Sequence, residues 1–375
     1  FIKKTSFRNF FRSKYPKKVL LVYVAEAFQT RKDSAKFRSH TNRWRNLAIA
    51  EVFHKKGYQV DVLDYRDVSK ARKIGRTYDL LLGMGEAFDY LCVNKASQFK
   101  KKVYLGTGTY WEFQNKQEES RIEQINSKYN ANLKPNRLAY NDPKMWGHID
   151  AIAVLASPFV AETYRKAFKG PIFRFYNHGY DDYDFFVKDK DFEKVRNRFI
   201  YISGLGFALN GLDLIIEAFS KFPQLHLDIY GPLDGEKEFL DTLGNILNVS
   251  PNIKLKGWVD VCSEDYREIV KNHAAIINSI AINACETHGT VVVGMNHGLI
   301  PVVTQGGDTA LKELGFIINP ISYDGVVNAL QSYIKTDAED LRLKSINTYR
   351  YARENYSQAA FVKRFEEIIS EIEDL

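Results

Sequence analysis

The sequence has few of the residues that mark disulfide-bonded, metal-bound or membrane-spanning proteins. Its three cysteines, Cys92, Cys262 and Cys285, are odd in number and lie far apart, without the spacing of a zinc site. They indicate a reducing compartment and no structural zinc. No apolar run has the length of a membrane span, and no signal-peptide pattern opens the chain. We therefore expect a cytoplasmic location.

Excess positive charge is absent from most of the chain, although the formal net charge is +7. Residues 1–18 hold seven Lys or Arg and no acid, and the remaining chain holds 46 basic and 46 acidic residues. A neutral body argues against a nucleic-acid-binding surface spread over the fold. Residues 1–18 also contain four phenylalanines, so this separate segment either lies on an anionic membrane surface, at the inner membrane face, or is a solvated basic tail.

Short apolar runs alternate with helical patterns through the first half of the chain. The strand-length runs are 19–25, 60–65, 78–83, 102–106, 151–157 and 172–176, and helical patterns cover 44–53 and the first half of 112–143. Such alternation predicts a parallel sheet covered by helices on both faces. Ligands of such sheets bind beyond the carboxyl ends of the strands, here in the loops 26–42, 83–87 and 106–111. None of these loops carries a dinucleotide-type Gly-x-Gly-x-x-Gly motif.

An acidic, turn-rich junction at 177–184 precedes a second α/β pattern. Asp182 and Asp184 within it form a weak candidate for metal binding, because Asp-x-Asp is common by chance. A strand at 198–203 then leads through a glycine-bearing loop, 204–211, into an amphipathic helix. Further strands are predicted at 225–229, 253–256 and 274–277, and further helices at 326–334, 341–352 and 361–372.

Residues 284–305 read as a loop, a helix, a turn and a buried strand. The helix 290–297 follows Gly289, Gly298 takes the position just after it, and 299–303 is the strand. Unpaired amides of 287–290 and the helix dipole can hold an anion such as a diphosphate. Glu286 lies beside this site, where a carboxylate accepts hydrogen bonds from sugar hydroxyls. An anion site next to a carboxylate indicates a nucleotide-sugar as the ligand. The alternative is an ordinary helix-strand unit with a solvated Glu286.

The second half resembles glycosyltransferases of the GT-B fold, specifically the large retaining family that uses nucleotide-diphosphate sugars. Residues 204–219, Gly231, Gly257, 286–298 and Pro301 recur in the order of that family. Residues 177–185 are similar to its Asn-Gly-Val-Asp-x-x-x-Phe junction, with His178 inserted and Tyr180 in the Val position.

The resemblance implies an α/β fold of two facing Rossmann-like domains. Residues 19–178 would form the acceptor domain and 179–352 the donor-nucleotide domain, with the closing helix, within 353–375, crossing back to the first domain. No metal and no other cofactor is implied. The implied partners are a nucleotide-sugar donor and a glycan or lipid-linked acceptor, as in the synthesis of surface polysaccharide or glycolipid.

The same resemblance implies the residues of the site. Glu286 would orient the donor sugar, and His288 could supply part of the positive charge that faces the diphosphate. Glu112 or His40, on first-domain loops facing the cleft, could assist the acceptor hydroxyl. His288, Glu112 and His40 each also have an ordinary structural explanation. The donor would be bound by Gly204, Asn210, Gly257, Trp258, Thr287, Gly289 and Thr290.

Three departures from the family bear on activity. Gly294 replaces a second Glu, Leu205 and Asn210 replace an Arg and a Lys that face the diphosphate, and the loop 106–111 lacks a His. Each charge-assisted hydrogen bond to the diphosphate is worth about 1.5–3 kcal/mol. Either another cation compensates, or the chain is a degenerate module that serves as a scaffold for a partner enzyme. A nucleotide-sugar epimerase is a further alternative.

Overall fold

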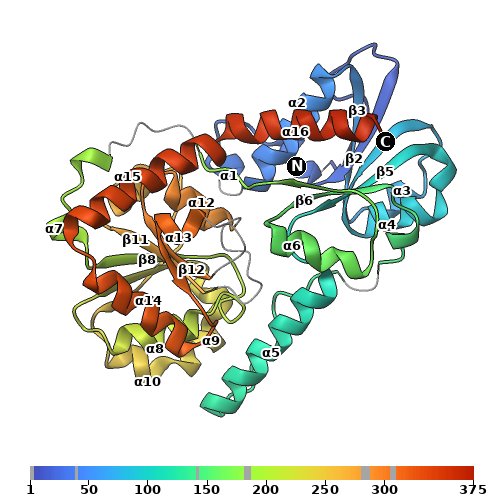
Figure 1. The fold of residues 1–375 in the computed structure, drawn as a ribbon. Helices are drawn as coiled ribbons and strands as arrows, with labels where there is room; N and C mark the ends of the chain where they lie inside the picture. Colours follow the sequence, from blue (N-terminus) through green and yellow to red (C-terminus); the bar gives the residue numbers. More distant parts are fainter. Residues whose placement is uncertain (1–3, 39–40, 141–142, 181–186, 280–287, 305–309) are drawn as a thin grey trace.

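The chain folds into two α/β halves, each built around one sheet (Figure 1). The computed structural model describes residues 4–38, 41–140, 143–180, 187–279, 288–304 and 310–375. Two largely parallel sheets covered by helices confirm the fold class that the alternating pattern predicts. Across the described ranges, no helix is both long and apolar enough to cross a membrane.

The first sheet has seven strands in the order β1-β3-β2-β4-β5-β6-β7. Only β1 pairs in the antiparallel sense, with β3. The central strands are continuous apolar runs because helices cover both faces of the sheet. Their bounds are β1 (Ser6–Phe7), β2 (Lys17–Tyr23), β3 (Tyr58–Asp64), β4 (Tyr78–Gly83), β5 (Phe99–Gly106), β6 (Ala151–Leu155) and β7 (Ile172–Phe175).

The second sheet has six parallel strands in the order β10-β9-β8-β11-β12-β13. The first five of these strands along the chain lie close to the predicted runs, with ends that differ by at most one residue, and β13 has no predicted counterpart. Their bounds are β8 (Arg198–Ile202), β9 (His226–Tyr230), β10 (Ile253–Gly257), β11 (Ala275–Asn278), β12 (Ile300–Thr304) and β13 (Phe316–Ile318).

Helices fill most of the connections between the strands, and the last three helices follow β13. In the first half they are α1 (Ala35–Arg38), α2 (Thr41–Lys55), α3 (Val68–Ala71), α4 (Gly85–Asn94), α5 (Trp111–Tyr129) and α6 (Pro158–Thr163). In the second half they are α7 (Phe192–Val195), α8 (Leu212–Ser220), α9 (Lys237–Thr242), α10 (Gly244–Asn248), α11 (Glu264–Lys271), α12 (Gly289–Met295), α13 (Ala310–Leu314), α14 (Tyr323–Lys335), α15 (Ala338–Asn355) and α16 (Gln358–Glu373). Gly298 has the positive φ, 71°, that its predicted position after α12 requires.

The basic segment at the start of the chain is continuous with the first sheet in its described part, 4–18. Ser6 and Phe7 pair with β3, and β2 already begins at Lys17. Phe7 and Phe10 pack their rings against Phe28 of the first-half core. The rings of Phe7 and Phe10 are therefore packed against the protein core, which does not favour contact of these two rings with a membrane surface.

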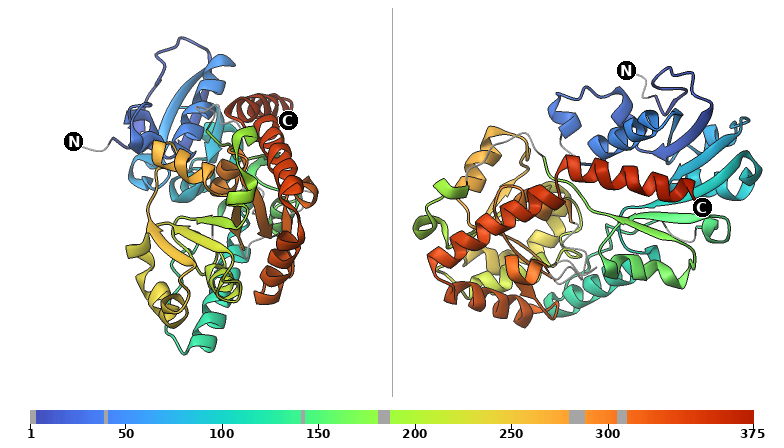
Figure 2. Two further views of the ribbon diagram at one scale, coloured as in Figure 1. Left: turned by 90° about the vertical axis from the view of Figure 1, so that its left-hand side faces the viewer. Right: turned by 45° about the horizontal axis from the view of Figure 1, so that its top comes forward.

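Two helices cross between the halves in opposite directions. The last helix, α16, lies against the first half, as the right-hand view of Figure 2 shows. Its apolar face is buried in the core of the first sheet, and the Tyr58 hydroxyl donates to Glu373 at 2.8 Å. The buried residues of that face are Phe361, Phe365, Ile368, Ile369 and Ile372.

Helix α5 crosses in the other direction, from the first half onto the second (Figure 1). Ile122 and Ile125, with Leu133 from the segment that follows, belong to the core of the second half. Arg121 forms a buried ion pair with Asp213 of α8, at 2.6 Å. The second half of α5 and the segment 130–140 after it are therefore anchored to the second half of the protein.

Candidate functional site

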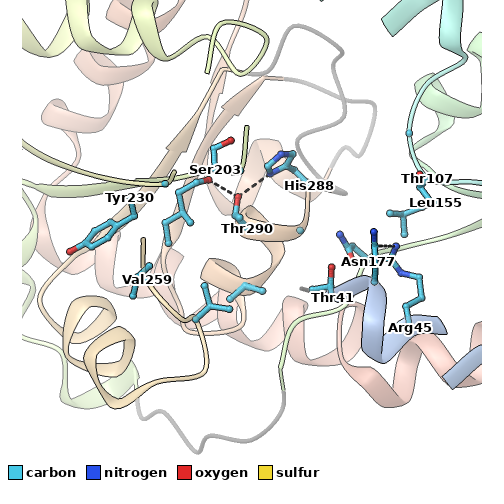
Figure 3. A pocket seen from close by; sticks show the side chains of 18 of the residues that line it. Thr41, Arg45, Thr107, Leu155, Asn177, Ser203, Tyr230, Val259, His288 and Thr290 are labelled. Atoms are coloured by element: carbon cyan, nitrogen blue, oxygen red, sulfur yellow. Dashed lines mark hydrogen bonds between the residues drawn. The ribbon is translucent and has the colours of Figure 1, made fainter. Parts of the chain in front are cut away.

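A pocket of about 340 Å³ lies between the two halves, at the carboxyl ends of strands from both sheets. Thr107 follows β5, Asn177 follows β7, and Ser203 follows β8. Parallel α/β sheets bind ligands at this edge. Figure 3 shows Thr41, Arg45 and Asn177 on one wall, with Ser203, His288 and Thr290 on the opposite wall.

The wall from the first half includes a buried arginine. Arg45 of α2 is 1% exposed, and its guanidinium donates to Asn42 Oδ1 at 2.8 Å and to Asn177 Oδ1 at 2.5 Å. No described carboxylate forms an ion pair with it. Taking a charge out of water without a counter-ion is costly, so Arg45 favours a negatively charged ligand in the pocket.

The wall from the second half approaches the first half closely at Gly289. A Cβ at this position would lie 3.0 Å from Asn177 Nδ2, and Thr41 Oγ1 would be 3.7 Å away. A larger residue would press against Asn177. Gly289 therefore sets how close the start of α12 comes to the polar groups of the first half.

His288 and Thr290 form a short hydrogen-bonded chain beside Gly289 (Figure 3). The Thr290 hydroxyl donates to Ile202 O at 2.7 Å, and its oxygen lies 3.0 Å from His288 Nδ1. Since the single hydroxyl proton is used on Ile202, His288 Nδ1 carries a proton and donates, which leaves Nε2 as an acceptor. Burial, together with the charge of Arg137, lowers the pKa of His288 to about 3.

A neutral His288 changes the role that the sequence suggested for it. The free protein holds this ring uncharged at neutral pH, so His288 does not supply the missing positive charge there. Among the described lining residues, the only charged side chains are Arg45 and Arg137. The described part of the pocket thus carries two positive charges and no carboxylate, which favours an anionic ligand.

Arg137 reaches the pocket from the segment after α5. Its Nη1 donates to Leu205 O at 2.6 Å, in the loop that follows β8. Burial lowers the pKa of Arg137 from its ordinary value, but the group stays charged at neutral pH.

The predicted donor-binding residues are distributed between the lining and the layer behind it. Gly204, Trp258, Gly289 and Thr290 line the pocket. Asn210 is fully buried and donates to Ser203 Oγ at 2.6 Å. Gly257 accepts a hydrogen bond from the amide of the lining residue Gly231, at 3.0 Å.

Of the predicted acceptor-side residues, Glu112 lies elsewhere. It belongs to the first turn of α5, not to a loop, and its half-exposed carboxylate pairs with Lys166 at 2.7 Å. It is not among the residues that line the pocket. The prediction that Glu112 lies on a loop facing the cleft is therefore wrong, because α5 already begins at Trp111. His40, Glu286 and Thr287 lie outside the described residues, as do Asp182 and Asp184. Within the described ranges, no group of three or more His, Cys, Asp or Glu could hold a metal ion.

Sequence reasoning missed Arg45 and Arg137. Arg45 had one detectable signal, because it lies on the stripe of α2 that also carries the buried Ile49 and Val52. A cation on an apolar helix face needs a partner or a function. Arg137 gave no signal, since it stands in a polar stretch that reads as an ordinary loop.

No protein-family profile matches the chain, and no curated protein matches it in sequence. Solved structures do match. Anabaena HepE, solved with UDP and glucose, is 14% identical over 96% of this chain and 100% of its own, with a TM-score of 0.58. A glycosyltransferase from Rickettsia africae is 13% identical over 96% and 99%, with a TM-score of 0.59. The catalytic domain of Arabidopsis thaliana starch synthase IV, solved with ADP and acarbose, is 12% identical over 96% and 99%, with a TM-score of 0.57.

The chain has the GT-B fold. The matches cover nearly the whole chain, so both halves and their connection belong to this fold. In this GT-B chain the pocket between the halves is the candidate active site, and both charged side chains of its described lining come from the first half of the chain.

Proposed function

We propose that the protein is a glycosyltransferase that binds a nucleotide-diphosphate sugar in this pocket and transfers the sugar to a glycan or lipid-linked acceptor. One observation carries the proposal: the described lining holds two arginines and no carboxylate, at the carboxyl ends of both sheets. A diphosphate matches that charge. Proteins of the same fold that were solved with UDP or with ADP support this ligand class.

Each half would hold a different part of the reactants. The first half would bind the acceptor, beside Thr107 and Gln114, and the second would bind the nucleotide, beside Tyr230 and Trp258. Glu286 would orient the donor sugar through its hydroxyls. Fixed positive groups that face the departing diphosphate stabilise the charge that develops on it during transfer. We infer that Arg45 and Arg137 allow transfer without a metal ion.

A thermal-shift panel tests the donor. A ligand that binds only the native state stabilises it by about 2.7 kcal/mol at a hundredfold excess over its dissociation constant. We expect one of UDP, GDP, ADP or TDP to raise the melting temperature, and uncharged nucleosides to have little effect. No shift with any of them at millimolar concentration would favour a scaffold module that has lost donor binding.

Turnover separates transfer from the epimerase alternative. Incubation with the matching nucleotide-sugar and a glycan mixture should release the nucleoside diphosphate and extend an acceptor, with or without a chelator. An epimerase would change the sugar without extending an acceptor. The resemblance to a retaining family predicts that the anomeric configuration of the product, read by NMR, equals that of the donor.

A peripheral contact with the cytoplasmic membrane face is a second part of the proposal. Arg8, Arg12 and Lys14 are exposed, although Phe7 and Phe10 are engaged within the protein. Each basic residue near an anionic surface is worth about 1 kcal/mol, and salt screens the attraction. The chain should sediment with anionic vesicles at low salt. A triple variant of these residues to Gln should not, and it keeps β1, which a truncation would remove. Equal sedimentation of both would leave a plain basic segment.

A further inference from the structure

The segment 130–140 is held against the second half by buried carboxylates. Glu118 of α5, with no exposed surface, accepts the amides of Asn136 at 3.0 Å and Arg137 at 3.2 Å. Glu236, 3% exposed, accepts the Gly206 amide at 2.5 Å and the Asn136 side chain at 3.2 Å. One carboxylate therefore fixes the segment, and the other joins it to the loop after β8.

Gly206 makes room for the side chain of Arg137. Its φ is +94°, a conformation that glycine adopts readily, and a Cβ there would lie 2.6 Å from Arg137 Cδ. Leu205 O, one residue earlier, accepts from Arg137 Nη1. The loop after β8 thus shapes the path along which Arg137 enters the pocket.

The two pocket arginines differ in what they leave available. Arg45 is fully buried, and both of its terminal nitrogens are bound to the side chains of Asn42 and Asn177. The Arg137 side chain is only partly buried, and among the described residues its one hydrogen bond is to Leu205 O. A guanidinium has five N–H donors, so most of those of Arg137 remain for a ligand.

The carboxylates near Arg137 stabilise its positive charge but leave its guanidinium without an ion pair among the described residues. Glu118 and Glu236 lie near enough to act on its charge, but neither forms an ion pair with it within the described residues. Both carboxylates are bound to backbone amides and to Asn136. Guanidinium groups bind phosphate oxygens in a bidentate manner, which matches a group positioned with its donors unused.

We propose that Arg137 binds the diphosphate of the nucleotide donor, and that α5 carries this cation across from the first half to the loop after β8. The inference rests on the proposed function and adds the residue that supplies the charge. The hydrogen bonds among Glu118, Asn136 and Glu236 fix the segment 130–140 in the absence of a ligand, so little conformational freedom is lost on binding. Arg137 thereby places a positive charge beside the loop after β8, whose own residues, 203–211, include no Lys or Arg.

The test separates phosphate binding from folding. Calorimetry measures the affinity of wild type and Arg137→Met for UDP, GDP, ADP and TDP, each beside its nucleoside. For the diphosphate that binds wild type, we expect the variant to lose about 10- to 100-fold in affinity, the range of one charge-assisted interaction. Affinity for the nucleoside should stay the same, because that ligand has no phosphate.

Two further variants provide controls. Arg342→Met removes a surface guanidinium that pairs with Glu339 on α15, and it should change neither affinity. Arg137→Gln can still donate to Leu205 O while it lacks the charge, so it decides the matter if the Met variant folds poorly. It should show the same phosphate-specific loss.

The outcomes distinguish the two proposals. If wild type binds no nucleoside diphosphate, the proposed function fails, and this inference fails with it. If wild type binds one and both Arg137 variants bind it equally well, only this inference is overturned, and Arg137 has a structural role. Equal losses for the nucleoside and the diphosphate would also overturn it, since they would indicate a displaced loop.

Discussion

The two walls of the pocket differ in what they contribute. In the described lining, the second half supplies glycines, hydroxyls, a neutral histidine and aromatic rings, whereas both charges come from the first half of the chain. A nucleotide needs close backbone approach and a surface for its base, and its diphosphate needs positive charge. Under the proposed function, those two requirements are divided between the halves of the chain.

The proposed division is consistent with two positions at which the chain departs from the family that it resembles. Asn210 stands where the family has Lys, and it is fully buried and bound to Ser203. Leu205 stands where the family has Arg, and its backbone carbonyl anchors Arg137. The loop after β8 has no cation, and one arrives from the opposite half through α5.

The largest effect is expected at the attachment of α5. Asp213 is 2% exposed and both its oxygens accept from Arg121 Nη2 at 2.6 Å. Asp213→Ala should cost about 3–5 kcal/mol in the free energy of unfolding, because it leaves Arg121 buried without its partner. Urea denaturation measures this cost. The double variant Arg121→Met, Asp213→Leu should recover most of it, and a single-variant loss below about 1 kcal/mol would show that α5 is not held by this pair.

A smaller effect is expected at Gly206. Gly206→Ala should destabilise the protein by about 1–3 kcal/mol and weaken diphosphate binding, because the new Cβ displaces Arg137. Gly57→Ala is the matched control, since Gly57 has a similar φ of +83° and a Cβ there would meet no atom within 4 Å. It should cost only the backbone penalty, about 1 kcal/mol. Equal costs and unchanged binding in both variants would contradict the contact.

Acid should destabilise both halves through buried histidines. Burial lowers the pKa of His178 to about 3 and that of His297 to about 4, whereas an unfolded histidine has a pKa of about 6.5. Below about pH 6.5 the unfolded chain binds protons at these histidines that the folded chain does not bind. The free energy of unfolding is therefore highest above about pH 6.5 and falls as pH drops toward 4. Each histidine contributes a slope of up to about 1.4 kcal/mol per pH unit.

A variant of His297 tests whether part of the pH dependence of the free energy of unfolding comes from the second half. His178 stands against Trp44 of the first half, and His297 follows α12 in the second. Urea denaturation at pH 7, 6 and 5 should show a shallower dependence in His297→Gln than in wild type. An identical dependence would mean that His297 is already charged in the fold.

The smallest effect is expected at Trp258. This side chain lines the pocket with 61% of its surface exposed, as suits a ring that stacks on a base. Trp258→Ala should weaken nucleoside and nucleoside diphosphate equally, by about 0.5–1.5 kcal/mol, without changing stability. This is the counterpart of Arg137→Met, which should affect only the diphosphate. A loss confined to the diphosphate would place the base elsewhere.

Local sequence patterns predicted the elements well where one physical signal dominates. The strand at 78–83 has the predicted bounds, and Leu212, Ile215, Ile216 and Phe219 of α8 are all buried. The predicted strand at 151–157 ends earlier, at Leu155, because the Ser157 hydroxyl caps α6 by accepting the Val160 amide at 3.2 Å. A serine before a proline is a cap signal that a strand reading overlooks.

The charged part of the site could not be predicted in the same way. Arg137 comes within reach of Leu205 through contacts that span 68 positions or more, from Arg121 to Asp213 and from Asn136 to Glu236. The periodicity of apolar residues predicts local helices and strands, but it does not predict which distant segment a loop packs against. The glycines of the second half were predictable because tight turns and close approach require them locally.

A crystal structure with the nucleoside diphosphate that stabilises the protein would show whether the diphosphate is bound by Arg137. We expect the diphosphate to lie between the loop after β8 and Arg137, with guanidinium nitrogens about 2.7–2.9 Å from phosphate oxygens and the base beside Trp258. A diphosphate bound away from both Arg137 and Arg45 would contradict the account, because the positive charge of the first half would then serve another purpose.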